Sequence, residues 1–194
     1  MSRKIILASK SPRRKRLLEQ IGLKFEVVES SFDEESVELA DPIELTKLLA
    51  LKKAESVAKN FEDAIVIGAD SVVIFKGRPL GKPKDEADAR EILRELSGKE
   101  NKAITGFAII DTKNKIIIND HSEATVKFRE LSDEEINDYI ATGEPLGMAG
   151  AYGLMDKGAV LMESISGNFY TIVGLPINQV YVELKKLGVN ALRI

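Results

Sequence analysis

Short apolar runs alternate with amphipathic segments along the first hundred residues of the chain. The run at 4–8 (KIILA) is rich in β-branched residues and predicts a buried strand. Ser11-Pro12 follows it and predicts a helix N-terminus, because serine caps helices and proline is favoured at the first helical position. Asp41-Pro42 opens a longer helical segment, and the run at 64–67 (AIVI) predicts another buried strand. This alternation of strand and helix is typical of an α/β domain.

The remainder of the chain adds hairpins and helices to this pattern. We expect a helix at 85–96, strands at 102–111 and 115–128 joined as a hairpin, a helix from Ser132 to Gly143, strands at 159–165 and 169–173, and a final helix from Pro176 to about Leu187. Ser132 and Glu135 have the spacing of a capping box, which supports the helix there. With neither a repeat nor a linker in 1–194, a single domain with a mixed sheet is predicted.

Composition narrows the class of protein. The 194 residues carry 28 basic and 31 acidic side chains, and this net charge of −3 argues against a bulk nucleic-acid binder. The absence of cysteine excludes thiol catalysis and thiolate metal sites, and the single histidine, His121, excludes sites built from several imidazoles. The N-terminus lacks a secretory pattern and no apolar run approaches the roughly 18 residues of a membrane span, so we expect a cytoplasmic protein.

The strongest local signal for chemistry is Ser9-Lys10-Ser11-Pro12-Arg13-Arg14, where a strand leads directly into a helix. The first N–H groups of a helix lack internal partners and carry partial positive charge. Arg13 and Arg14 oppose that dipole, which is unfavourable unless an anion lies among them. A phosphate would bind the amides, the hydroxyls of Ser9 and Ser11 and both guanidinium groups. The alternative is a capped surface helix with solvated arginines.

Acidic residues supply a second signal. Asp70 follows the apolar run at 64–67 and is predicted to end that buried strand, after which 71–75 continue extended. The carboxyl end of a buried strand is where open α/β sheets bind ligands. A carboxylate there commonly holds Mg²⁺ or activates water, although Asp70 could also simply terminate the strand or cap a turn. Glu34, in the acidic stretch 33–35, could join Asp70 around a metal ion or belong to a solvated loop.

Two lysines are further candidates. Lys53 follows Lys52 on the predicted long helix, where lysines are usually exposed. Lys82 is more suggestive, because a glycine and a proline on either side constrain its loop. The segment 77–83 (GRPLGKP) is one residue too short for a P-loop and has proline in place of the magnesium-binding Ser/Thr. The cations therefore favour a polyanionic ligand without a Walker A motif.

Taken together, these segments resemble the Maf family of nucleoside triphosphate pyrophosphatases. The order and approximate spacing of the matching segments cover nearly the whole chain, which makes the resemblance specific. The segments are ASKSPRRKRLL (8–18), FDEE (32–35), LLALKKA (48–54), IGADSVV (67–73), LGKP (80–83), LSG (96–98), ITG (104–106), AGAYGLMDKGA (149–159) and GLP (174–176).

The resemblance implies an elongated α/β fold of the inosine triphosphatase type, with a mixed sheet and two lobes around a central cleft. It implies hydrolysis of the α–β phosphoanhydride bond of a nucleoside triphosphate to the monophosphate and pyrophosphate, as house-cleaning of canonical or modified nucleotides. A divalent cation (Mg²⁺, Mn²⁺ or Co²⁺) is the implied cofactor and a homodimer the implied assembly.

The same resemblance assigns roles to individual residues. It makes Asp70 the acceptor of the proton from the attacking water, and Glu34 and Asp70 the metal ligands. Lys82 is implied in catalysis through the phosphates. The implied substrate-binding residues are Ser9, Ser11, Arg13, Arg14, Lys53, Ser71 and Met155.

The segment after AGAYG departs from the family pattern. The subgroup that acts on dTTP and UTP usually has Ile-Gln-Gly there, whereas this chain has Leu154-Met155-Asp156. A thioether cannot donate amide hydrogens to a base edge, so a broader or shifted nucleotide range is open. The SPRR segment still favours the pyrimidine subgroup over the methylated-guanine subgroup. The alternative from another class is a non-catalytic nucleotide- or nucleic-acid-binding regulator of cell division and septum formation.

Overall fold

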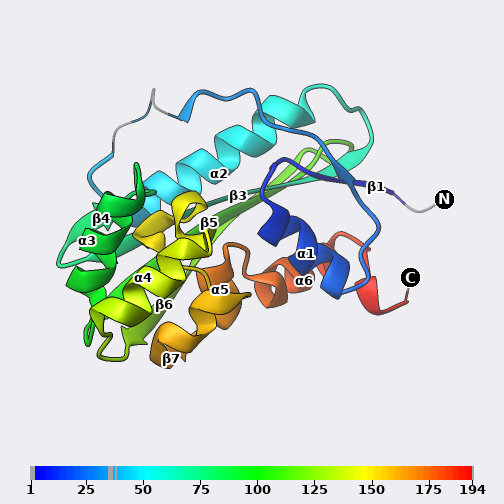
Figure 1. The fold of residues 1–194 in the computed structure, drawn as a ribbon. Coiled ribbons are helices and arrows are strands. Elements are labelled where there is room, and N and C mark those ends of the chain that lie inside the picture. The colour runs from blue at the N-terminus through cyan, green and yellow to red at the C-terminus, as the bar shows by residue number, and fades with distance from the viewer. Residues whose placement is uncertain (1–2, 35–36, 38, 194) are drawn as a thin grey trace. The chain divides into compact units, whose positions relative to one another are not determined.

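The computed structural model describes residues 3–34, 37 and 39–193, so Glu35 of the acidic stretch lies outside the described residues. Within these residues the strands form one seven-stranded sheet in the order β2-β1-β3-β5-β6-β7, with β4 paired to β3 (Figure 1). β1 pairs in parallel with β2 and β3, while β4 and β7 run antiparallel to β3 and β6. The sheet is therefore mixed, and the predicted α/β class is confirmed.

The strands are β1 (Lys4–Leu7), β2 (Glu26–Val27), β3 (Ala64–Phe75), β4 (Arg78–Leu80), β5 (Glu100–Asp111), β6 (Ile116–Phe128) and β7 (Met162–Gly167). The helices are α1 (Pro12–Gln20), α2 (Pro42–Ala58), α3 (Glu86–Leu96), α4 (Asp133–Ala141), α5 (Phe169–Val173) and α6 (Ile177–Lys186). Short 3₁₀ turns follow at Glu144–Gly147, Ala149–Ala151, Lys157–Leu161 and Ala191–Arg193. In the described part of the chain, no helix is both long and apolar enough to cross a membrane.

The chain divides into two compact units. The first comprises residues 1–70, 105–122 and 174–194, and the second comprises 71–104 and 123–173. The long strands β3, β5 and β6 each contribute residues to both units. One domain with two lobes around a central cleft stays a prediction.

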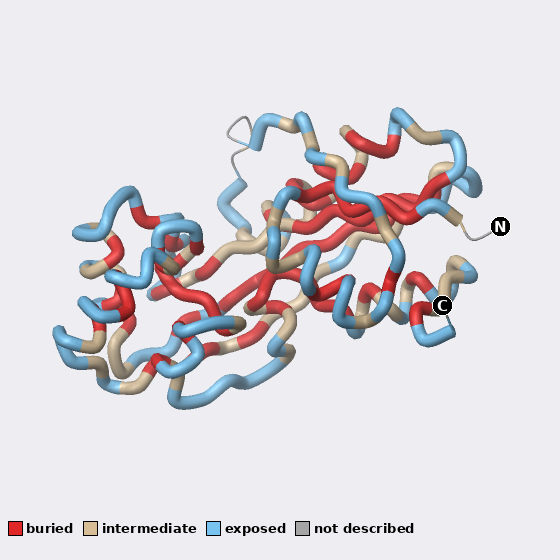
Figure 2. The backbone as a smooth tube through the Cα atoms, turned by 45° about the vertical axis from the view of Figure 1, so that its right-hand side comes forward, coloured by how far each residue is buried: buried red, intermediate tan, exposed pale blue. Residues whose placement is uncertain are grey.

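In the first unit, helices cover both faces of the sheet: α2 lies on one side and α1 and α6 on the other (Figure 1). Ile6 and Val66 pack with Ala54 of α2 in one buried cluster. Ile5 and Ile67, whose side chains point to the opposite face, are buried as well. Strands that are covered on both faces have continuous apolar runs instead of alternating apolar and polar residues. The runs at 4–8 and 64–67 have this continuous pattern. Figure 2 shows buried positions running along these strands and exposed positions on the helices.

The second unit has its own apolar core, built from β-strand residues and from α3 and α4. Leu93 and Ile136 of the two helices are buried in one cluster with Phe128 and Tyr152. The rings of Phe128 and Tyr152 meet edge to face with centroids 5.0 Å apart. The hydroxyl of Tyr152 donates to Asn101 Oδ1 at 2.7 Å, so that this buried polar group is satisfied.

One predicted strand has a shifted start, and another is wrong. The segment predicted as a strand at 159–165 begins inside the 3₁₀ turn Lys157–Leu161, and β7 starts only at Met162. The segment 169–173 is helix α5, because the side chain of Asn168 accepts a hydrogen bond from the Tyr170 N–H at 3.0 Å and starts a turn there. A short apolar run does not by itself distinguish a strand from a buried helix.

Candidate active site

The N-terminus of α1 carries the first group of candidate residues. Ser9 follows β1 and is buried, and its hydroxyl accepts hydrogen bonds from the Ser11 N–H and from Arg14 Nη1, both at 3.2 Å. Ser11 is the N-cap of α1, and its hydroxyl accepts a long hydrogen bond from the Arg14 N–H at 3.5 Å. The helix start predicted at Ser11-Pro12 is confirmed.

Arg14 is a fixed cation at this helix end. Its Nε donates to the Gly174 carbonyl at 2.8 Å, which together with the Ser9 contact holds the guanidinium on two sides. Burial lowers the pKa of Arg14, as does the positive charge of Arg13, whereas Asp70 and Glu34 raise it. The first turn of α1 contains no acidic residue to offset these two arginines. Such an arrangement suits an anion.

Asp70 lies inside β3 rather than at its end: the strand end predicted there is wrong, whereas the extended conformation predicted for 71–75 is confirmed. β3 continues through 71–75, and its last three residues pair with β4, from Val73↔Leu80 to Phe75↔Arg78. On the other side, β1 and β3 pair only up to Leu7↔Ile67, and Asp70 comes after that last pair. The Asp70 carboxylate therefore stands at the edge where β1 has ended and turned into α1, which is the ligand-binding edge of a parallel pair.

A buried lysine on α2 holds the acidic residues together. Lys53 Nζ lies 2.7 Å from Asp70 Oδ1 and 2.8 Å from Glu34 Oε2, and only 9% of the Lys53 side chain is exposed. The expectation that lysines on this helix are exposed is thus wrong for Lys53. It holds better for Lys52, whose side chain is 42% exposed and pairs with Glu55.

The sequence did contain a signal for the burial of Lys53. The buried side chains of α2 are Thr46, Leu49, Ala50, Lys53, Ala54, Val57 and Ala58. This is the i, i+3, i+4 spacing of one helix face, and Lys53 stands in the middle of it. A lysine at a core position of an amphipathic helix needs an anionic partner, and here Lys53 has two, the mostly buried Asp70 and the exposed Glu34.

Two glycines let α2 approach the sheet closely enough for this contact. A Cβ on Gly68 of β3 would lie 2.3 Å from the Ala50 carbonyl oxygen, and a Cβ on Gly106 of β5 would lie 2.4 Å from the Thr46 backbone. Any side chain at either position would push the helix away from the strands. Gly68 is also only two residues before Asp70, so the close approach is made where Lys53 must reach the carboxylate.

Glu34 is brought to the cluster by a tethered loop. The hydroxyls of Ser30 and Ser56 are 2.8 Å apart, and Ser30 Oγ also accepts from the Phe32 N–H at 3.1 Å. Ser56 lies on α2 one turn after Lys53 and donates to its carbonyl at 2.8 Å. Glu34 thus lies in an exposed loop, with 53% of its side chain accessible to solvent, and at the same time contacts Lys53; its role as a metal ligand stays a prediction. Nothing in the sequence marked the two serines, because their partnership spans separate elements.

The donor set fits a divalent cation that is shared with a phosphorylated ligand. Among the described residues, no group of three or more His, Asp and Glu side chains could hold a metal by itself. Mg²⁺, however, is commonly bound by one or two carboxylates together with substrate phosphates. Glu34 and Asp70 supply two carboxylates, and the single positively charged Nζ in contact with both marks a place that attracts a cation.

The other candidate residues belong to the second unit. Lys82 is exposed, in the turn between the β4 hairpin and α3. Ser71 is half-buried in β3 directly after Asp70. Met155 is half-buried in the loop before Lys157–Leu161, and Glu144 anchors that loop by accepting from the Lys157 N–H at 3.0 Å. The roles of Ser71, Lys82 and Met155 stay predictions.

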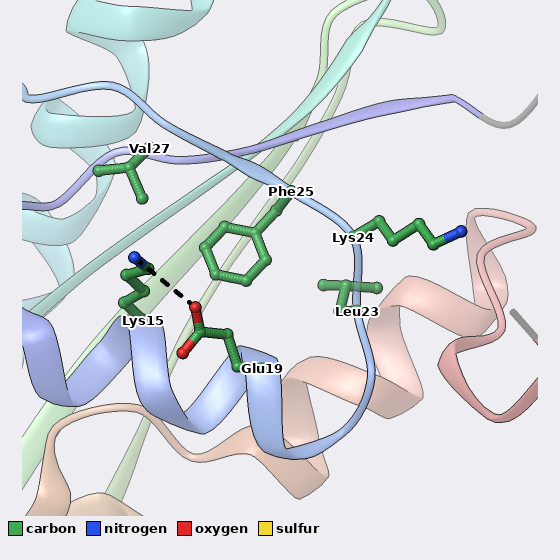
Figure 3. Close-up of a pocket in the computed structure, with 6 residues that line it drawn as sticks. All are labelled: Lys15, Glu19, Leu23, Lys24, Phe25 and Val27. Atoms are coloured by element: carbon green, nitrogen blue, oxygen red, sulfur yellow. Dashed lines mark ion pairs between the residues drawn. The ribbon is translucent and has the colours of Figure 1, made fainter.

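An open depression on the first unit is separate from these residues. It lies between α1 and the segment around β2 and is lined by Lys15, Glu19, Leu23, Lys24, Phe25 and Val27 (Figure 3). Lys15 and Glu19 pair across one helical turn at 3.7 Å. None of the predicted site residues lines it.

Comparison with known proteins identifies the family to which the sequence is similar. Residues 4–187 match the family model described as Maf-like protein. A dTTP/UTP pyrophosphatase of Dictyoglomus turgidum is 45% identical over 193 residues, which are 99% of this chain and 100% of the relative. A dTTP/UTP pyrophosphatase of Bacillus cereus is 46% identical over 188 residues, 97% of each chain.

Among solved structures, the Ham1 protein of Staphylococcus aureus is 16% identical. The match covers 66% of this chain and 72% of that one, with a TM-score of 0.47. The family model and the two relatives extend over nearly the whole chain and confirm the resemblance of the motifs: the chain belongs to the family of Maf-like proteins.

Proposed function

We propose that this chain hydrolyses pyrimidine nucleoside triphosphates, with dTTP and UTP as first candidates, at the α–β phosphoanhydride bond. The relatives that match it over their full length carry the name dTTP/UTP pyrophosphatase. The single observation that carries the proposal is the contact of Lys53 Nζ with both Asp70 and Glu34. The charges of both carboxylates also raise the pKa of Arg14 on α1, so the acidic and basic groups influence one another. A triphosphate with a divalent cation suits such a mixture of fixed charges.

The arginines of α1 bind the phosphates in the proposed complex. Attack at phosphorus adds charge to the equatorial oxygens, and fixed cations stabilise that charge without reorganising during the reaction. Arg14 is already oriented by Ser9 and Gly174, so little of its freedom is lost on binding. The first N–H groups of α1 add donors for a phosphate oxygen.

Asp70 is the proposed acceptor of the proton from the attacking water. Lys53 orients its carboxylate, and only 14% of the Asp70 side chain is exposed, so the group is held rather than solvated. A positioned base of this kind contributes about 10²–10⁴-fold to a rate. Glu34 and Asp70 are the residues that hold the divalent cation, which supplies charge neutralisation at the phosphoryl oxygens when bound.

Three roles are proposed from the family motifs. Lys82 contacts the phosphates and takes part in catalysis, while Ser71 and Met155 contribute to the choice of base. Because a thioether donates no hydrogen bond, Met155 supports weaker discrimination between bases than a glutamine there. We therefore expect measurable turnover of nucleotides beyond dTTP and UTP.

Pyrophosphate release from a nucleotide panel tests the reaction. The purified chain is incubated with dTTP, UTP, dCTP, CTP, dATP and dGTP, each with Mg²⁺ and each after removal of metal by EDTA. We expect pyrophosphate rather than orthophosphate, loss of turnover with EDTA, and recovery when Mg²⁺ is restored. Reaction in ¹⁸O-labelled water then locates the attacked phosphorus, because label in the monophosphate requires attack at the α position. Release of orthophosphate would contradict the proposed bond.

Lys82 has a matched control two residues away. Lys82→Met should lower turnover, whereas Lys84→Met removes the same charge from another exposed lysine of the same turn and should leave turnover unchanged. Equal effects of the two variants would remove Lys82 from the mechanism. Tight nucleotide binding without any product would favour the non-catalytic regulator instead.

Assembly and location complete the proposal. The family resemblance makes a homodimer the expected assembly, and light scattering at micromolar concentration distinguishes it from a monomer. Nucleoside triphosphates are metabolites of the cytoplasm, which is where the proposed reaction takes place.

A further inference from the structure

One ammonium group serves two carboxylates in the candidate active site. Lys53 Nζ is 2.7 Å from Asp70 Oδ1 and 2.8 Å from Glu34 Oε2, which are charge-assisted contacts of good length. Asp70 and Glu34 are also the residues proposed to hold the divalent cation. In the free protein, the position that attracts a cation is thus already served by a cation of the chain itself.

We propose that Lys53 is a built-in counter-ion that keeps the affinity for divalent metal low until nucleotide binds. This inference rests on the proposed function, since it concerns the cofactor of that reaction. A divalent ion that approaches the two carboxylates meets the Lys53 charge at close range and must displace it from at least one of them. When a triphosphate is present, its oxygens offer Lys53 another partner, and both carboxylates become available to the metal.

The setting of Lys53 makes such an exchange local. Its backbone is fixed, because α2 rests directly on Gly68 and Gly106. Its side chain is 9% exposed, so the ammonium cannot simply move into solvent when a metal arrives. Glu34 is the more exposed partner by contrast, with 53% of its side chain accessible to solvent, and its loop is tethered to α2 through the hydroxyl contact of Ser30 with Ser56. Exchange therefore needs motion of side chains rather than of α2.

The consequence is positive coupling between metal and nucleotide. A ligand that relieves the contact between Lys53 and the carboxylates must raise metal affinity, and metal must raise nucleotide affinity by the same factor. A purely structural ion pair predicts something different: its loss would loosen the Glu34 loop and leave metal affinity unchanged or lower.

Binding of Mn²⁺ alone, measured by electron paramagnetic resonance, separates these two roles. The wild type, Lys53→Met and Lys53→Gln are titrated with Mn²⁺ in the absence of nucleotide and again with α,β-methylene-dTTP. We expect each variant to bind Mn²⁺ alone about 10-fold more tightly than the wild type, and the analogue to enhance Mn²⁺ binding less than in the wild type. Lys53→Gln keeps a hydrogen-bond donor, so the test can still be made if Lys53→Met does not fold.

The control is the adjacent lysine. Lys52→Met removes the same charge from α2, but Lys52 pairs with Glu55 and is partly exposed, so its Mn²⁺ affinity should equal that of the wild type. Unchanged or weaker Mn²⁺ binding in Lys53→Gln, with wild-type circular dichroism, would overturn the proposal. Mn²⁺ binding is measured independently of turnover. If the Lys53 variants bound Mn²⁺ more tightly but the wild type released no pyrophosphate, the role of Lys53 as a counter-ion would stand and the proposed reaction would be wrong.

Discussion

The two ends of the parallel strands β1 and β3 carry the same kinds of side chains in opposite arrangements. At the N-terminal end, Arg3 donates from both Nη atoms to the two oxygens of Asp111 and from Nε to Asp63 at 3.1 Å. Asn114 adds its N–H and its side-chain amide, so that each oxygen of the fully buried Asp111 accepts two hydrogen bonds. These donors hold the pKa of Asp111 well below its usual range.

At the C-terminal end, by contrast, a single ammonium is divided between two carboxylates. Lys53 serves Asp70 and Glu34 together, and Glu34 is half-exposed. A cluster whose acceptors are saturated has no capacity for a further ligand, whereas a cluster that shares one donor can exchange it for another cation or anion. Charge alone therefore does not mark a site: the number of donors per acceptor distinguishes the structural cluster around Asp111 from the candidate functional cluster around Lys53.

Removing the carboxylate of Asp70 should have the greatest effect on the candidate active site. Asp70→Asn keeps the shape of the side chain but removes the proposed proton acceptor, so kcat for nucleotide hydrolysis should fall about 10²–10⁴-fold. The midpoint of thermal unfolding should change little, since Lys53 retains Glu34. Asp138→Asn, an exposed carboxylate on α4, is the matched control and should leave kcat unchanged. A fall in kcat of less than 10-fold for Asp70→Asn would assign the proton to another group.

The next prediction concerns the structural cluster around Asp111. Asp111→Asn leaves Arg3 without its bidentate partner inside the protein and should lower the free energy of unfolding by about 3 kcal/mol, measured by urea denaturation. The folded fraction should keep the wild-type kcat, because the cluster lies at the other end of the strands. Lys113→Met breaks only the exposed pair with Asp63 and should change stability by at most about 1 kcal/mol. Equal losses from the two variants would contradict the contrast between buried and exposed pairs.

The stabilisation by Asp111 should also depend on pH. Because the pKa of Asp111 is lower in the folded than in the unfolded chain, its stabilisation is complete above the unfolded value of about 4. It is lost as pH falls through the folded value. The difference in unfolding free energy between wild type and Asp111→Asn should therefore be constant from pH 7 to about pH 5 and shrink below about pH 4. A difference that stays constant down to pH 2 would show that the charge of Asp111 contributes nothing.

Local signals in the sequence predicted much of this fold. The helix caps at Ser11, Asp41 and Ser132 and the buried strands β1 and β3 are set by residues adjacent in sequence, and the structure confirms them. The strand end predicted at Asp70 is wrong because β3 continues to its pairing with β4, and the strand predicted at 169–173 is helix α5, because a short apolar run fits either state.

The candidate site divides in a similar way. The anion-binding features of α1 could be read from the clash between two arginines and the helix dipole, which is a local conflict. The buried position of Lys53 could have been read from helix periodicity, but its two partners could not, since they come from a loop and a strand far away in sequence. Ser71, Lys82 and Met155 are assigned by family motifs and stay predictions.

A subtler change, at Gly68, tests whether the candidate active site depends on how closely α2 approaches the sheet. Gly68→Ala places a Cβ 2.3 Å from the Ala50 carbonyl oxygen and 3.0 Å from Ala54, and both are parts of α2 that cannot yield without moving the helix. We expect a loss of about 1–3 kcal/mol in unfolding free energy, measured by urea denaturation, together with a loss of kcat greater than the stability change explains, because Lys53 moves with α2 relative to Asp70. Gly147→Ala, where an added Cβ meets nothing within 4 Å, is the control and should preserve both quantities. A stable Gly68→Ala protein with wild-type kcat would show that Lys53 reaches Asp70 through the length of its own side chain, and that the close packing of α2 serves the core alone.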